Sequence, residues 1–152
     1  MAAASTPSAN ILLIGDSAVG KTSIINQRVG RGFKESEIAS LGLDFVPQTV
    51  TPASDPNFQY SLKIWDTAGQ ERFHSLTTAF YKQSQGMIIC FDLTRKKTFD
   101  SVKRWAEACQ TNCETGIPLI LVGNKCDLED EWQVQESEAR DIAKEIGGVK
   151  YF

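Results

Sequence analysis

The stretch that decides the fold is Ile11-Leu12-Leu13-Ile14-Gly15-Asp16-Ser17-Ala18-Val19-Gly20-Lys21-Thr22. From Gly15 onward it fits the pattern G-x-x-x-x-G-K-[ST] at every fixed position. The four apolar residues before Gly15 predict a buried strand, and a helical pattern follows from about Lys21 to Val29. A chance Gly-Lys-Thr on a surface loop is the alternative. The strand before the loop and the helix after it favour a phosphate-binding loop instead.

Each part of this loop has a chemical role toward the phosphates of a nucleoside triphosphate. Glycines let the backbone bend around an anion so that successive N–H groups point at its oxygens, and the helix adds its positive N-terminal end. Lys21 would supply a full charge to the β and γ phosphates, and the Thr22 hydroxyl suits Mg²⁺. The loop alone does not choose between ATP and GTP. The nucleotide-binding residues expected here are Gly15, Asp16, Ser17, Ala18, Val19, Gly20, Lys21, Thr22 and Ser23.

A second polar motif, Asn124-Lys125-Cys126-Asp127, follows the apolar run 119–122 and Gly123. The Asp127 carboxylate can accept hydrogen bonds from both N1–H and the exocyclic amine of guanine, a donor pair that adenine lacks. Leaving such a carboxylate buried and unpaired is unfavourable, so the site would reject adenine. A polar turn that merely closes a strand is the alternative. Downstream of a phosphate loop, the motif predicts a guanine nucleotide bound by Asn124, Lys125 and Asp127.

A third motif, Trp65-Asp66-Thr67-Ala68-Gly69-Gln70-Glu71, stands at the end of another expected strand. Asp66 is expected to hold Mg²⁺ through water, and the Gly69 backbone N–H to contact the γ-phosphate. Gln70 carries both a donor and an acceptor, which suits orienting a water in line with the leaving phosphate. Gln70 is therefore the candidate catalytic residue.

Apolar runs alternate with helical patterns along the whole chain, which is typical of an α/β sheet with right-handed crossovers. The turn-rich segment 51–57 separates two alternating runs and predicts an antiparallel hairpin. One domain is expected over residues 10–152, after a disordered N-terminal tail of residues 1–9. The sequence predicts strands at 11–14, 44–50, 60–65, 87–91, 119–122 and 149–152, and helices near 21–29, 73–84, 99–111 and 135–146.

Composition excludes several other classes of protein. The 152 residues are 41% hydrophobic and 23% charged with a net charge of −3, which favours neither nucleic acid nor an anionic membrane surface. No apolar run is long enough to span a membrane, and the first ten residues do not resemble a signal peptide.

A zinc site at the four cysteines is one interpretation. With one histidine and no Cys-x-x-Cys spacing, buried or half-buried reduced thiols are the favoured one.

The three motifs together resemble the small GTPases, and Trp65 to Phe73, WDTAGQERF, resembles the Rab subfamily. Leu41-Gly42-Leu43-Asp44-Phe45 is similar to the Rab consensus Ile-Gly-Val-Asp-Phe. The resemblance covers residues 10–152 and implies a P-loop GTPase fold: a mostly parallel six-stranded sheet with one antiparallel edge strand and helices on both faces.

The resemblance also implies roles for individual residues. Phe33 would stack on the guanine, and Ser40, where the family usually has Thr, would bind Mg²⁺ and sense the γ-phosphate. The metal ligands would thus be Thr22, Ser40 and Asp66. Phe45, Trp65 and Phe80 align with an aromatic triad that contacts effectors in Rab proteins. For Trp65 and Phe80, packing in the core is an alternative to effector contact, and the sequence favours neither interpretation over the other.

As a whole, the resemblance implies a switch that binds GTP or GDP with Mg²⁺, hydrolyses GTP slowly and recruits effectors in the GTP state. The resemblance also implies two further partners, an exchange factor and a GTPase-activating protein. The cellular process that it implies is vesicle trafficking. The family continues with a Ser-Ala-Lys element, a last helix and a prenylated tail. We therefore expect a C-terminally incomplete domain that would reach the cytosolic face of endomembranes only through a lipidated tail. The rival hypothesis is a truncated, non-catalytic module that binds effectors.

Overall fold

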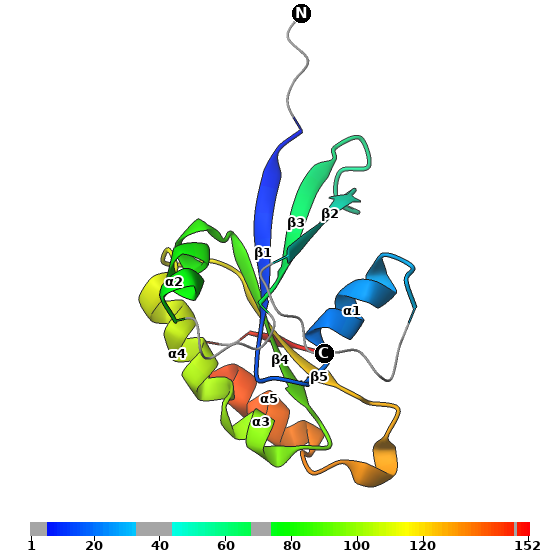
Figure 1. Ribbon diagram of the computed structural model, residues 1–152, viewed down its shortest axis with the longest axis vertical. Coiled ribbons are helices and arrows are strands. Elements are labelled where there is room, and N and C mark those ends of the chain that lie inside the picture. Colours follow the sequence, from blue (N-terminus) through cyan, green and yellow to red (C-terminus); the bar gives the residue numbers. More distant parts are fainter. Residues whose placement is uncertain (1–5, 33–43, 68–73, 148) are drawn as a thin grey trace, which may run out of the picture.

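The computed structural model describes residues 6–32, 44–67, 74–147 and 149–152, and shows strands and helices that alternate along the chain (Figure 1). The first half contains β1 Ser8–Ile14, α1 Lys21–Arg28, β2 Asp44–Val50, β3 Tyr60–Asp66, α2 His74–Gln83 and β4 Gly86–Asp92. The second half contains α3 Lys96–Asp100, α4 Val102–Asn112, β5 Leu119–Asn124, the 3₁₀ turn η1 Glu129–Glu131, α5 Glu136–Glu145 and β6 Lys150–Tyr151. None of the described helices has both the length and the apolar character that a bilayer crossing requires.

The strands form one sheet in the order β2-β3-β1-β4-β5-β6. β2 pairs antiparallel with β3, from Asp44 opposite Asp66 to Val50 opposite Tyr60, and the other pairs are parallel. The α/β fold expected from the sequence is therefore confirmed, including the antiparallel edge strand. Because the carboxyl ends of parallel strands meet at one edge, the segments after β1, β3, β4 and β5 are brought together there.

Helices cover both faces of the sheet, α1 on one side and α2, α4 and α5 on the other (Figure 1). The sheet has a hydrophobic core on each face, and successive residues of β1 and β4 pack alternately into one core and the other. Leu12 and Ile89 pack in the larger core beneath α4 and α5, whereas Leu13 and Cys90 pack with Ile25 of α1. Burial on both faces explains why these strands are continuous apolar runs rather than alternating ones.

The observed elements differ from the sequence-based expectation in three details. β1 begins at Ser8, which pairs with Ser61, so Ser8 and Ala9 lie in a strand and not in the disordered tail expected for residues 1–9. The helix expected near 99–111 is two helices, α3 and α4, and the first of them begins at Lys96. The prediction placed this start too late because the residues of the first turn are polar and show no apolar periodicity. The four cysteines are free thiols, and Cys126 is exposed rather than buried.

Candidate nucleotide-binding site

The phosphate loop lies between β1 and α1 and is held in a conformation that requires its two glycines. Gly15 has a φ of 143° and Gly20 a φ of 101°, both in the region that favours glycine. A Cβ at Gly15 would collide with the carbonyl oxygen of Cys90, and one at Gly20 would collide with Nδ2 of Asn124. Val19 is fully buried in the core beneath α1 and anchors the loop from below.

Lys21 begins α1, and its side chain is buried beneath its own loop. Its Nζ donates to the carbonyl oxygens of Gly15 at 3.0 Å and Asp16 at 2.8 Å. Burial lowers the pKa of the Lys21 ammonium below its ordinary value, against the opposing attraction of Asp66, Cys90 and Asp16. The Lys21 ammonium is therefore held in place beneath the loop by the loop's own carbonyl oxygens.

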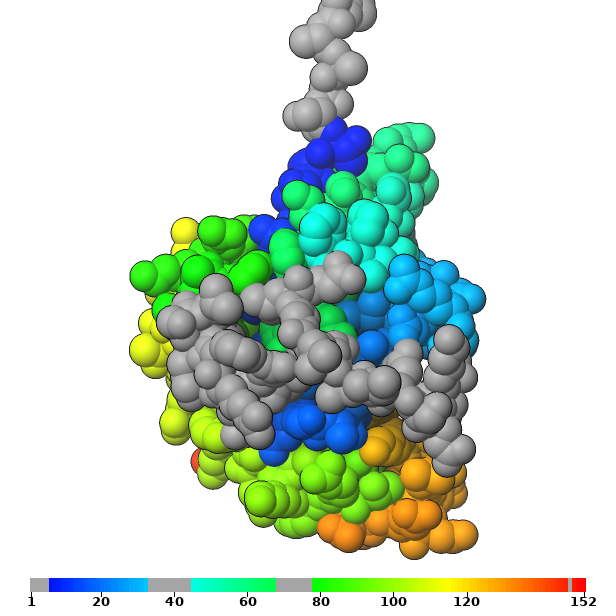
Figure 2. Space-filling view, viewed as in Figure 1, coloured from blue at the N-terminus to red at the C-terminus, as the bar shows by residue number. Residues whose placement is uncertain are grey.

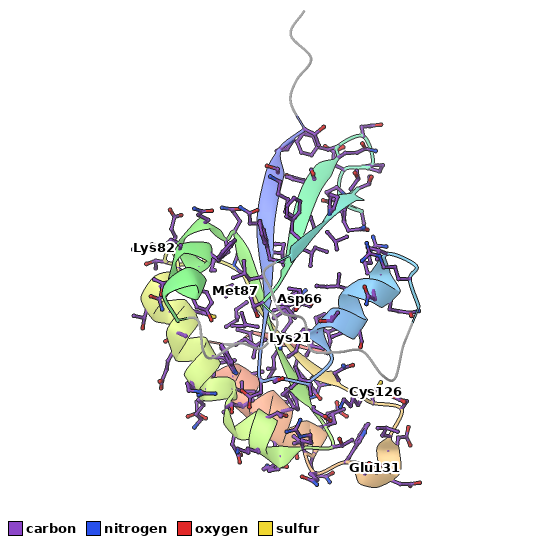
Figure 3. The ribbon with its side chains drawn as sticks, in the orientation of Figure 1. Lys21, Asp66, Lys82, Met87, Cys126 and Glu131 are labelled. Atoms are coloured by element: carbon purple, nitrogen blue, oxygen red, sulfur yellow. The ribbon has the colours of Figure 1, made fainter. Side chains whose placement is uncertain are left out.

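Thr22 and Asp66 meet beside this lysine. The Thr22 hydroxyl donates to Oδ2 of Asp66, which ends β3 and is itself buried. The hydroxyl of the following residue, Thr67, donates to the carbonyl oxygen of Leu13 at 2.7 Å and ties this strand end to β1. Lys21 and Asp66 accordingly lie close together where the strands end beside α1 (Figure 3).

The second motif reaches the same place from the end of β5. Nδ2 of Asn124 donates to the carbonyl oxygen of Val19 at 2.8 Å, so this amide joins the base motif directly to the phosphate loop. Lys125 has a φ of 64°, and Ala18 in the phosphate loop one of 63°; they are the two non-glycine residues with positive φ among those described. Backbone conformations of this kind concentrate at functional sites.

An ion pair fixes Lys125. Its Nζ lies 2.7 Å from Oδ2 of Asp92, a fully buried carboxylate at the end of β4. The other oxygen of Asp92 accepts from the backbone N–H and hydroxyl of Thr94 at 2.8 and 2.6 Å. Burial opposes ionisation, but the hydrogen bonds from Lys125 and Thr94 outweigh it and hold the pKa of Asp92 below its usual value.

A pocket of about 430 Å³ opens between the two motifs. One wall consists of Gly20 in the phosphate loop with Ser23, Ile24 and Gln27 of α1, and the other consists of Asn124 at the end of β5 with Lys125, Asp127 and Leu128. On the surface, the blue start of α1 and the orange segment after β5 lie next to each other (Figure 2). The pocket adjoins the phosphate loop at Gly20 and has the Asp127 carboxylate in its wall.

Comparison with known proteins identifies the family. The family model described as "Ras family" matches residues 10–152. The chain belongs to the Ras family. It is 39% identical over 142 residues to the Ras-related protein Rab-13 of Canis lupus familiaris, which is 93% of this chain and 68% of that protein. It is 43% identical to RABA5b of Arabidopsis thaliana, covering 90% of this chain and 62% of that protein, and 40% identical to the GTP-binding protein ypt2 of Schizosaccharomyces pombe, covering 93% and 68%.

The aromatic triad of this Rab-like small GTPase is assembled. The Phe45 and Trp65 rings lie 4.7 Å apart between centroids, and the Trp65 and Phe80 rings 4.9 Å apart. Trp65 and Phe80 pack partly against the larger core, whereas Phe45 is 40% exposed. Core packing and surface exposure thus both apply to the triad.

Of the residues expected to form the site, the structure brings together the phosphate loop, Asp66, Asn124, Lys125 and Asp127. Phe33, Ser40, Gly69 and Gln70 lie outside the described residues.

Sequence reasoning missed Asp92. Its signal was present, because Asp92 ends an apolar strand in the same way as Asp66 ends β3. The carboxyl ends of neighbouring parallel strands share one edge of the sheet.

Proposed function

We propose that this Rab-like GTPase is a molecular switch that binds GTP or GDP with Mg²⁺, hydrolyses GTP and recruits effectors in the GTP state, in vesicle trafficking. One observation carries the proposal: the Asn124 amide donates to the carbonyl oxygen of Val19, and the pocket beside this bond is lined both by Gly20 of the phosphate loop and by Asn124, Lys125 and Asp127. A single nucleotide could occupy the phosphate loop and this pocket at once.

The phosphates would bind around Lys21. Its ammonium already lies within hydrogen-bond distance of two loop carbonyls, so little reorganisation is needed for it to reach an anion seated in the loop. The first turn of α1 contains no acidic residue, so the positive end of the helix faces the anion unopposed by a carboxylate of its own. A bound phosphate would also offset the burial that lowers the pKa of Lys21.

The donor set beside Lys21 fits a hard divalent cation. A hydroxyl from Thr22 and a carboxylate from Asp66 converge there, and oxygen ligands of this kind are what Mg²⁺ prefers when phosphates supply the rest. When bound, the ion would neutralise charge developing on the β and γ phosphates. Thr22 and Asp66, with Ser40 as the expected third ligand, are the residues that would hold it.

Different segments of the chain would bind the guanine base and orient the attacking water. Asp127 would accept the paired donors of guanine while Phe33 stacks on the ring. Gln70 would orient the water, with Gly69 contacting the γ-phosphate. Effectors would contact the two switch segments, which contain Ser40 and Gly69, and the triad Phe45, Trp65 and Phe80. An exchange factor and a GTPase-activating protein would set the rates of the cycle. A lipidated tail would provide attachment to the cytosolic face of endomembranes.

Nucleotide binding tests the proposal directly. We expect the chain to bind GDP and GTP in the presence of Mg²⁺, to bind ATP far more weakly, and to convert GTP to GDP slowly in a single-turnover assay. Lys21→Met should lower affinity for GDP by about 10- to 100-fold, since it removes charge-assisted hydrogen bonds to phosphate. Lys82→Met is the matched control, because Lys82 is exposed on α2, away from Lys21 (Figure 3).

The outcomes separate the competing hypotheses. Binding of guanine nucleotide without any turnover would support the non-catalytic module over the switch. Equal affinity for ATP and GTP would contradict the role of Asp127. A chain that binds neither nucleotide would overturn the proposal.

A further inference from the structure

The side chain of Asp16 faces away from the interior of the phosphate loop and is held by α4. Its Oδ2 accepts a hydrogen bond from the Ser101 hydroxyl at 2.8 Å, and its Oδ1 accepts one from the Trp105 indole Nε1–H at 2.9 Å. Nη2 of Arg104 lies 3.3 Å from the same Oδ1. Ser101, Arg104 and Trp105, here called the α4 tether, are 85 to 89 residues away in the chain.

The tether is supported by the core and by a junction between two helices. Trp105 packs partly against the larger core, and Ser101 forms the junction between α3 and α4. The Asp16 side chain is only 15% exposed, so its hydrogen bonds act where solvent screens them little. Hydrogen bonds from neutral and cationic donors to a carboxylate are among the stronger ones in proteins.

An aspartate in this position presents an electrostatic problem. The loop surrounds an anion with N–H donors, and a carboxylate free to turn inward would repel that anion. Asp16 also has a second connection, because its own carbonyl oxygen accepts the Nζ of Lys21 at 2.8 Å. One residue therefore links the lysine beneath the loop to a helix on the opposite face of the sheet.

We propose that Asp16 is a positioning residue: the α4 tether holds its carboxylate away from the polyphosphate and fixes the loop peptide that Lys21 contacts, so that retention of nucleotide depends on α4. This inference rests on the proposed function, since it concerns the phosphates of the bound guanine nucleotide.

The test is a mutational cycle that reads out the rate of GDP release with a fluorescent GDP analogue. Ser101→Ala with Trp105→Phe removes both neutral donors while keeping an aromatic ring at position 105. We expect GDP release to become about 10-fold faster or more, because each lost hydrogen bond to a charged group corresponds to roughly that factor. Adding Asp16→Asn to this double variant should slow release again, since it removes the freed charge. In the unaltered chain, the same Asp16→Asn should speed release.

The opposite effects of Asp16→Asn on the rate of GDP release in the two backgrounds distinguish charge positioning from simple loss of packing. The acceleration should also shrink at high salt, because a freed carboxylate is screened. Trp132→Phe is the matched control, since Trp132 is exposed after η1, and it should leave release unchanged. If the double variant does not fold, as judged by circular dichroism, the same cycle is run with Ser101→Ala alone.

Unchanged GDP release in the tether variants, alongside normal binding by the unaltered chain, would overturn the tether and leave the proposed function standing. The same applies if Asp16→Asn has the same effect in both backgrounds. If the unaltered chain binds no guanine nucleotide, the proposed function fails and this inference fails with it.

Discussion

At the scale of single residues, the absence of a side chain at Gly20 is what allows the two parts of the candidate nucleotide site to come together. A Cβ there would lie 2.1 Å from Nδ2 of Asn124, the group that donates to the carbonyl oxygen of Val19. The φ of 101° adds a second obstacle, because L side chains rarely adopt it. The phosphate loop and the base motif can approach each other only because position 20 has no side chain.

We therefore expect Gly20→Ala to abolish measurable GDP binding and to lower the free energy of unfolding by about 2–4 kcal/mol, through backbone strain and the collision together. Gly30→Ala separates the two effects. Gly30 also has a positive φ, 76°, but nothing lies within 4 Å of its Cβ position. It should lose only about 1 kcal/mol and keep GDP binding. Urea unfolding and a GDP titration measure both quantities, and equal behaviour of the two variants would contradict the role of the collision.

At the scale of elements, α5 approaches the sheet through small side chains. Ala139 and Ala143 lie four residues apart on one face of the helix and are buried in the larger core, while Ser137 on the same helix is exposed. Alanines at this spacing let a helix pack closely against the core, and Ala139 is fully buried.

Ala139→Leu should accordingly lower the free energy of unfolding by about 1–3 kcal/mol, because a filled core accommodates extra methylenes only by shifting its neighbours. Ser137→Leu adds a side chain of the same size at the exposed position and should change stability by no more than about 0.5 kcal/mol. Thermal or urea unfolding of the two variants makes the comparison. Equal destabilisation would mean that α5 does not dock through this face.

At the scale of the whole molecule, the ion pair of Asp92 and Lys125 joins the ends of two central strands and makes stability depend on pH. The pKa of Asp92 is below its ordinary value of 3.8 in the folded protein, so its ionised form stabilises the fold. That contribution is fully present above the ordinary pKa, and it is lost as pH falls below about 3.8 and through the folded pKa.

Asp92→Asn should remove this dependence. At pH 7 we expect it to lower the free energy of unfolding by about 1–3 kcal/mol, since Lys125 loses its anionic partner. Towards pH 3, the difference from the unaltered chain should shrink. Asp100→Asn, at an exposed position on α3, serves as the control and should follow the unaltered chain. Urea unfolding between pH 3 and 7 measures the effect, and a gap that stays constant with pH would contradict it.

Local chemistry determined much of this molecule in advance. Apolar runs and turn residues placed every strand and nearly every helix, because burial on both faces leaves a pattern that a single sequence displays. The phosphate loop and the segment from Asn124 to Asp127 were identified because their chemistry resides in contiguous residues. The division of α3 from α4 was missed, since the first turn of α3 carries no apolar period.

Only the tertiary structure decided how those segments meet. The sequence predicts that Asp16 binds nucleotide as part of its loop, whereas its carboxylate accepts hydrogen bonds from Ser101, at the junction of α3 and α4, and from Trp105 of α4. The pairing of Lys125 with Asp92 and the bond from Asn124 to Val19 likewise join residues far apart in the chain. The physical reason is that a local pattern specifies backbone conformation and burial, whereas the partner of a polar side chain depends on which strand ends the sheet brings to one edge.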